Sequence, residues 1–283
     1  MLVAMRQRVL LGLLAVGASA CSILFPLDDY EGSGGVGAAG ASSAGGSAGV
    51  PASAYREAVL ADGPVAYLRF GEKSGTVAKD EMGQHNGTYL SGVELGAPGA
   101  IEGDTDTAAS FDGSLESRVE IPPSPSIDFP GMSPFTVEMW ARQTRGTGYG
   151  FVIDHETYPN NRTGIGFLAS VSGRAGVPDD MAMVRYEKAS ADALGTRRAL
   201  ARGTYQHVVG TFDGVNAALY IDGVKITDIF RLNVSPITTT WTIGGQNCNC
   251  AMDNFAGSID EVAIYNKALD ERRILAHFRA AGR

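Results

Sequence analysis

The sequence predicts an all-β fold, a β-sandwich or barrel in one domain, with a short helix at each end. About a dozen short runs of β-favouring residues occupy roughly 230 residues, a pattern typical of sandwiches and barrels. Asp-Gly pairs separate the clearest of these runs and indicate tight hairpins. No internal repeat stands out, so a repeat architecture is not expected.

The first ordered element is expected to be a short helix in SAYREAVLADGP, which starts at Ser53. Ser53 is a suitable N-cap, because its hydroxyl can accept a hydrogen bond from a free N–H of the first turn. Asp62, Gly63 and Pro64 end the segment, and this combination stops helices.

The run FTVEMWAR alternates with a period of two, as a strand with two distinct faces does. One face would carry Phe135, Val137, Met139 and Ala141, and the other Thr136, Glu138, Trp140 and Arg142. Trp140 could serve as a platform for a sugar ring, but burial in the core is favoured, because helices can cover the second face of a sheet. Further strands are expected at VAYLRF, AASFDG, RVEI, YGFVID, GIGFLASV, MAMVRY and TWTIGG.

The segment YQHVVGTFDGVNAALYIDGVKITDIF carries the strongest local signal. Its Asp213-Gly214 and Asp222-Gly223 pairs separate three β-rich runs, and Asp-Gly between alternating runs favours a hairpin turn. We expect a meander of three strands.

A helix is expected to close the chain, with Asp270 as its N-cap. Ile274, Leu275, Phe278 and Ala281 form one apolar stripe, and Gly282 follows the last turn. Its arginines are interpreted as a solvated face rather than a site for an anionic partner.

The net charge of −8 argues against nucleic acid as a partner. Residues 1–20 have the basic start, apolar run and small residues of a secretory signal, and the run is too short to span a bilayer. The stretch resembles a bacterial lipoprotein signal in which Cys21 carries the lipid, although Ala18 stands where that pattern prefers Leu. Ser22 favours sorting to the outer membrane. Residues 21–52 are rich in Gly, Ala and Ser and are expected to form a flexible tether.

Five segments stand in an order that resembles bacterial laminin-G-like domains: VLADGPVAYLRFGE, DTAASFDG, FTVEMWAR, YQHVVGTFDGVNAALYIDG and FAGSIDEVAIYNKALDERRI. These domains belong to the concanavalin A-like lectin/glucanase jelly rolls. The resemblance implies a two-sheet antiparallel jelly roll over residues 53–283. The sequence departs at Tyr67-Leu68-Arg69, where the family usually has Tyr-Trp-Arg.

Catalysis is not expected. Jelly-roll glucanases take their carboxylates from one strand, as Glu-x-Asp-x-x-Glu, because alternate residues share a face. The acidic pairs Asp179-Asp180 and Asp260-Glu261 are adjacent, so in a regular strand their members would point to opposite faces. The four histidines are far apart in sequence, and none stands at metal-ligand spacing from a cysteine or carboxylate.

Of the three cysteines, Cys248 and Cys250 are left with free choice of bonding if Cys21 is lipidated. They could form a strained local disulfide, half of a metal site or two free thiols. An oxidising compartment favours the disulfide.

The resemblance also implies a structural calcium ion near the meeting of the first and last strands. Asp80 and Asn86, in a polar loop, and Asp260 are the candidate ligands, since calcium prefers carboxylate and amide oxygens. Turn chemistry is the alternative role for Asp80 and Asn86.

Strict alternation in GSIDEVAIYN would place Asp260 with Val262 and Ile264 on an apolar face. Asp260 would then need calcium, an arginine or backbone N–H groups as a partner, because a buried unpaired carboxylate is costly. Glu261 is expected at an exposed edge or in a salt bridge.

The sequence therefore predicts a non-catalytic binding or adhesion module of a Gram-negative cell-envelope lipoprotein, in the outer membrane. Its partner would be a glycan or a surface protein, and the lipid on Cys21 would hold it to the membrane. A carbohydrate-active enzyme on the same fold and a structural envelope component are the alternatives. No residue can be assigned to the ligand from the sequence.

Overall fold

The computed structural model describes residues 54–144, 148–157, 163–171, 180–187, 190–195, 200–229, 237–246 and 254–283. Ala48–Arg283 group into one compact unit. The predicted signal segment, the tether, Cys21, Ser53, Cys248 and Cys250 lie outside the described residues, and the predictions made for them stand as predictions.

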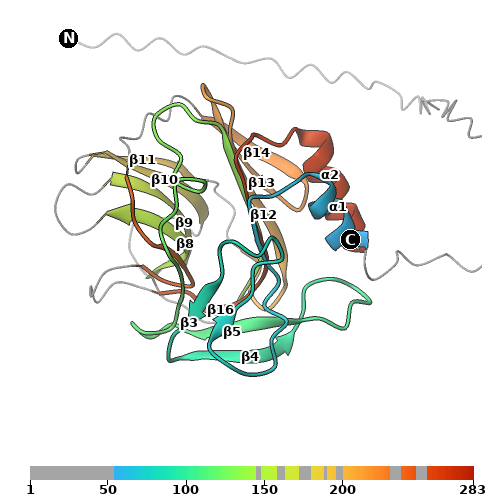
Figure 1. The fold of residues 1–283 in the computed structure, drawn as a ribbon. Helices are drawn as coiled ribbons and strands as arrows, with labels where there is room; N and C mark the ends of the chain where they lie inside the picture. Colours follow the sequence, from blue (N-terminus) through green and yellow to red (C-terminus); the bar gives the residue numbers. More distant parts are fainter. Residues whose placement is uncertain are drawn as a thin grey trace, which may run out of the picture. The chain divides into compact units, whose positions relative to one another are not determined.

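Two antiparallel sheets form a sandwich, which confirms the predicted all-β fold (Figure 1). Sheet 1 has the order β14-β13-β12-β7-β16-β5-β4, with β1 also paired to β16, and sheet 2 has the order β11-β10-β9-β8-β15-β6-β3-β2. The strands of sheet 1 are β1 (Ala66–Leu68), β4 (Val93–Pro98), β5 (Thr107–Asp112), β7 (Phe135–Gln143), β12 (Gln206–Phe212), β13 (Ala217–Ile221), β14 (Val224–Ile229) and β16 (Ala256–Tyr265). The strands of sheet 2 are β2 (Val77–Ala78), β3 (Gly87–Tyr89), β6 (Val119–Ile121), β8 (Gly148–Thr157), β9 (Thr163–Val171), β10 (Asp180–Glu187), β11 (Ser190–Gly195) and β15 (Trp241–Ile243).

The main core fills the space between the sheets. The predicted inward face of β7, which is Phe135, Val137, Met139 and Ala141, belongs to this core. Removing such apolar side chains from water is the dominant favourable contribution to folding. The alternation read from the sequence is therefore confirmed on β7.

Two helices, α1 (Ala54–Ala61) and α2 (Glu271–Ala280), cover the other face of sheet 1 (Figure 1). A second apolar cluster lies beneath them and includes Trp140, Tyr55 and Ile274. Trp140 is fully buried there, as expected. Because both faces of sheet 1 are covered, β7 is buried along nearly its whole length.

The predicted meander is present as β12, β13 and β14, paired in sequence order. The turn between β13 and β14 holds Asp222 at φ 54° and Gly223 at φ 72°. Two successive residues with positive φ suit the twist of a two-residue hairpin, and Asp-Gly supplies them at low cost. Asp270 caps α2 as predicted, because its side chain accepts the N–H of Arg273.

In the part of the chain that the structure describes, no helix has the length and hydropathy needed to cross a membrane.

Candidate functional site

Glu138, on β7, lies at the centre of a buried polar network between sheet 1 and the helices. Its carboxylate accepts hydrogen bonds from the hydroxyls of Tyr55 (2.9 Å) and Tyr265 (3.0 Å). Ring nitrogens of His207 (2.7 Å) and His277 (3.0 Å) also donate to it. Burial acts to raise the pKa of Glu138, but the two histidines outweigh it and hold that pKa well below its usual value. Through these hydrogen bonds the Glu138 carboxylate links α1 and α2 to strands of sheet 1.

His277, on α2, bridges two carboxylates. Its Nδ1 faces Glu138, and its Nε2 lies 2.9 Å from Asp62, just after α1. Burial acts to lower the pKa of His277, but the carboxylates of Glu138 and Asp62 outweigh it and raise the pKa above its usual value. The imidazolium thus links α1, α2 and β7.

The pair Asp260-Glu261 lies at a β-bulge in β16, where the register against β7 shifts. Glu261 has φ 54°, so the strand does not alternate strictly, and the predicted placement of Asp260 with Val262 and Ile264 is wrong. Asp260 lies opposite Trp140 on the helix-covered face, while Ile259 and Val262 both remain in the main core. The bulge inserts one extra residue into β16. Ile259 and Val262 can therefore both face the main core although they are three positions apart.

Asp260 is 2% exposed, and its Oδ2 accepts the N–H of Ala100 at 2.8 Å. A backbone N–H is thus the partner found, one of the three that the sequence allowed. Among the residues that the structure describes, none forms a hydrogen bond with the Oδ1 of Asp260. Burial, with Glu261 beside it, raises the pKa of Asp260 well above its usual value.

Glu261 is fully buried and forms an ion pair with Arg69, with Nη2 and Oε1 2.8 Å apart. The salt bridge predicted for Glu261 is therefore present, and the exposed edge is not. Arg69 also contacts Asp104 (2.9 Å) and Asp106 (3.1 Å), and the Tyr67 hydroxyl donates to Glu261. Burial raises the pKa of Glu261 to about 7, against the opposing effect of Arg69.

Asp80 and Asn86 lie together in the loop after β2, where the Asn86 side chain accepts the N–H of Asp80 at 2.8 Å. Both carboxylate oxygens of Asp80 are occupied by two backbone N–H groups each, which uses the lone pairs that a carboxylate offers. The donors are Tyr67, Met82, Gln84 and His85. These contacts match the turn-chemistry role that the sequence allowed as the alternative for this pair. Within the described ranges, no group of three or more His, Cys, Asp or Glu side chains could hold a metal ion.

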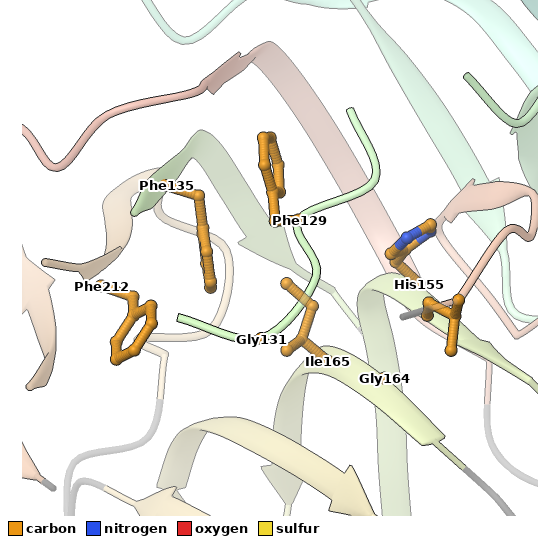
Figure 2. A pocket seen from close by; sticks show the side chains of 8 residues that line it. Phe129, Gly131, Phe135, His155, Gly164, Ile165 and Phe212 are labelled. Atoms are coloured by element: carbon orange, nitrogen blue, oxygen red, sulfur yellow. The ribbon is translucent and has the colours of Figure 1, made fainter. Parts of the chain in front are cut away.

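A small apolar cavity lies between the sheets, with Phe129, Phe135 and Phe212 on one side and His155 on the other (Figure 2). Its volume is about 10 Å³, enough for one water molecule. The His155 ring stacks on Trp241 at 4.3 Å, and burial lowers its pKa to about 3, so the ring is neutral. This cavity cannot accept a sugar.

Asp154 and Glu156 share the face of β8 opposite His155, because alternate residues of a strand share a face. They are 1% and 2% exposed. Gln246 donates a hydrogen bond to Glu156 at 2.9 Å. The spacing Asp-x-Glu is visible in the sequence, but it is neither the Glu-x-Asp-x-x-Glu pattern nor an adjacent acidic pair.

A larger cleft of about 510 Å³ lies on the helix-covered face of sheet 1, beside the start of α2. We name it the β13 cleft. Its lining includes Thr211, Asp213, Asn216, Tyr220, Leu269 and Asp270. This volume is within the range of about 300–1,000 Å³ typical of small-molecule sites.

The floor of the β13 cleft is buried and its rim is exposed. Thr211, Tyr220 and Leu269 are 5–6% exposed, whereas Asp213 and Asp270 on the rim are exposed. The Leu269 wall is fixed, because its N–H donates to the Thr136 hydroxyl at 2.9 Å. No sequence motif marked this cleft, since its residues come from the meander and from the segment before α2.

A family model described as the concanavalin A-like lectin/glucanases superfamily, Laminin_G_3, matches residues 103–275, more than half of the chain. No curated protein matches.

Solved structures show the same fold at low identity. The binding domain of Paraclostridial Mosquitocidal Protein 1 aligns with 77% of this chain and 52% of its own, at TM-score 0.60 and 18% identity. A Trypanosoma rangeli sialidase aligns with 76% of this chain and 32% of its own, at TM-score 0.56 and 16% identity. The protein thus spans about half of the first relative and a third of the second.

A third structure matches over nearly its full length. Domain 4 of AbnA, a GH43 extracellular arabinanase from Geobacillus stearothermophilus, was solved in complex with arabinotriose. It aligns with 76% of this chain and 97% of its own, at TM-score 0.55 and 18% identity. With the two-sheet sandwich and the family match in agreement, the chain belongs to the concanavalin A-like lectin/glucanases superfamily.

Proposed function

We propose that this domain is a non-catalytic carbohydrate-binding module and that the β13 cleft is its binding site. The observation that carries the proposal is the lining of the cleft, which combines a buried aromatic floor with an exposed polar rim. Sugars present apolar C–H faces and many hydroxyls, so a site for them needs both kinds of surface.

The polar groups of the cleft suit hydroxyl recognition. Carboxylates such as Asp213 and Asp270 accept hydrogen bonds from hydroxyls, and the amide of Asn216 can both donate and accept. Thr211 and Tyr220, both on the buried floor, add two hydroxyl groups to the lining. The arabinotriose in the complex of the arabinanase domain supports a glycan as the partner, and the binding domain of the mosquitocidal protein supports a binding role.

A glycan array followed by calorimetric titration of the full chain tests this proposal. Asn216→Ala should weaken binding of an identified glycan about tenfold or more, because it removes an amide from the rim. Val215→Ala is the matched control, since Val215 is exposed in the same turn but does not line the cleft. A variant Asn216→Ala that binds like the wild type would remove the β13 cleft from the proposal, and binding only to a protein partner would replace the glycan.

A carbohydrate-active enzyme is the second candidate, favoured by Asp154 and Glu156. Two residues along a strand place their Cα atoms about 7 Å apart. Inverting glycosidases separate their two carboxyl groups by roughly 6.5–9.5 Å. Release of reducing sugar by the wild type, abolished in both Asp154→Asn and Glu156→Gln but not in Glu116→Gln, would establish this second function. A wild type that binds glycan and releases none supports the binding module.

We infer an exported lipoprotein of the Gram-negative outer membrane from the signal-like residues 1–20, the tether and Cys21. Metabolic palmitate should label the wild type, and Cys21→Ala should abolish the labelling. Labelling that persists in this variant would contradict the anchor. The state of Cys248 and Cys250 is read by mass measurement with and without reductant, where two free thiols would exclude the disulfide.

Calcium stays a prediction drawn from the family resemblance. A melting temperature that falls with a chelator and recovers with added calcium would support it. An unchanged melting temperature would remove it and leave Asp80 with the loop role that its four N–H contacts indicate.

A further inference from the structure

We propose that the β13 cleft selects neutral or amine-bearing sugars and discriminates against sugars that carry a carboxylate. This inference rests on the proposed function of the cleft and adds the chemical class of its ligand. Two properties of the cleft support this selectivity: the charges of its rim residues, and the hydrogen bonds or ion pairs that charged groups near the rim already form.

Carboxylates stand on two different walls of the cleft. Asp213 belongs to the turn between β12 and β13, and Asp270 precedes α2. The N–H groups of Asn216 and Val215 both donate to Asp213 at 2.7 Å and lower its pKa, so this carboxylate stays ionised at neutral and mildly acidic pH. A ligand carboxylate in the cleft would face like charge from two sides.

The N-terminus of α2 does not compensate for this charge. A free helix N-terminus attracts anions, because its first N–H groups lack partners. Here Asp270 already accepts the N–H of Arg273 at 2.9 Å, and Glu271 adds a second carboxylate in the first turn. The first turn of α2 thus already carries negative charge from the protein itself, which opposes the approach of an acidic sugar.

Basic side chains are outnumbered by carboxylates in the lining of the cleft. Of the described residues that line the cleft, Lys225 is the basic one, it is exposed, and it already has an interaction of its own. Arg273 is directed to Asp62, with Nε and Oδ2 2.8 Å apart. The formal charge of the lining is therefore negative, from two Asp against one Lys, in a chain whose net charge is −8.

The polar groups that remain suit hydroxyl and ammonium donors. A neutral sugar can donate its hydroxyls to Asp213 and Asp270 and take hydrogen bonds from Asn216. An amino sugar adds an ammonium group, which two carboxylates attract.

The experiment uses the full chain on an array of matched oligosaccharides: neutral, amine-bearing and carboxylated forms of the same backbones, including uronic and sialic acids. We expect the carboxylated form of each bound backbone to bind at least tenfold more weakly than the neutral form. The gap should narrow as salt is added, because screening weakens exposed charge effects. In the double variant Asp213→Asn/Asp270→Asn, it should fall to about threefold or less, since Asn preserves both the turn and the helix cap.

Glu57→Gln/Glu116→Gln is the control, because it removes two exposed negative charges that do not line the cleft and should leave the selectivity unchanged. Equal or tighter binding of carboxylated forms by the wild type would overturn the selectivity while leaving the binding module intact. Unchanged selectivity in the Asp213→Asn/Asp270→Asn variant would overturn the assignment to these two residues. Binding to no oligosaccharide would overturn the proposed function and the selectivity with it.

Discussion

At the scale of single residues, His277 makes stability depend on pH. Its folded-state pKa is raised above the unfolded value of about 6.5. Its contribution is therefore complete below that pH and is lost as the pH rises through the folded-state pKa. Glu261, whose pKa is about 7, and Asp260, whose pKa is also raised, add their own pH dependence, so the difference between the wild type and a His277 variant isolates the histidine.

We expect the melting temperature of the wild type to fall between pH 7 and pH 9. The melting temperature of His277→Gln should be lower than that of the wild type at pH 7. The corresponding loss of stability is about 3–5 kcal/mol, typical of a buried charge that loses its partner. The variant's profile should also be flatter. Parallel profiles for the two proteins would contradict a protonated His277.

Asp260 contributes to stability through its contact with the N–H of Ala100. Asp260→Ala should cost about 1–3 kcal/mol, because it leaves the buried N–H of Ala100 without an acceptor. Asp260→Asn keeps an oxygen that can accept this N–H and removes a carboxyl group beside Glu261, so it should destabilise less than alanine does. Urea unfolding of the three proteins measures this order, and an alanine variant as stable as the wild type would contradict the assigned contact.

At the scale of elements, α1 and α2 act as a cover for sheet 1. Tyr55 of α1 forms a T-shaped ring pair with Trp140, with ring centroids 6.0 Å apart, and donates to Glu138. Tyr55→Ala should cost about 3–5 kcal/mol, typical of a large aromatic lost from a core. It should also raise the acrylamide quenching of Trp140.

The chain has two tryptophans, so a Trp241→Phe background isolates Trp140 in this experiment. Glu57→Ala, on the exposed side of the same helix, is the control. Unchanged quenching after Tyr55→Ala would show that α1 does not shield Trp140.

Regular elements could be predicted from the sequence because their signals are local. Alternation on β7, Asp-Gly turns in the meander and the Asp270 cap each involve residues close together in the chain. The bulge at Glu261 could not be predicted, because a register shift depends on the partner strand. The contacts of Glu138 with His207 and His277 join residues at least 69 positions apart, which no spacing rule could connect.

At the scale of the whole molecule, the proposed binding cleft and the acidic pair of β8 lie on different sheets of the sandwich. The helices cover much of sheet 1, and the β13 cleft lies where α2 begins. Asp154 and Glu156 lie on the other sheet, on the face opposite His155. Binding and hydrolysis would therefore occupy separate sites, and a variant of one should leave the other unchanged.

The location of bound sugar on the protein decides whether the β13 cleft is the binding site. Amide NMR spectra of the ¹⁵N-labelled full chain, titrated with a neutral glycan identified on the array, should show shifts concentrated at residues 211–225 and 268–270. The spectra of the Asn216→Ala variant should show much smaller shifts at the same glycan concentration. Shifts confined to β8 and β9, around Asp154 and Glu156, would contradict the assignment of the β13 cleft as the binding site.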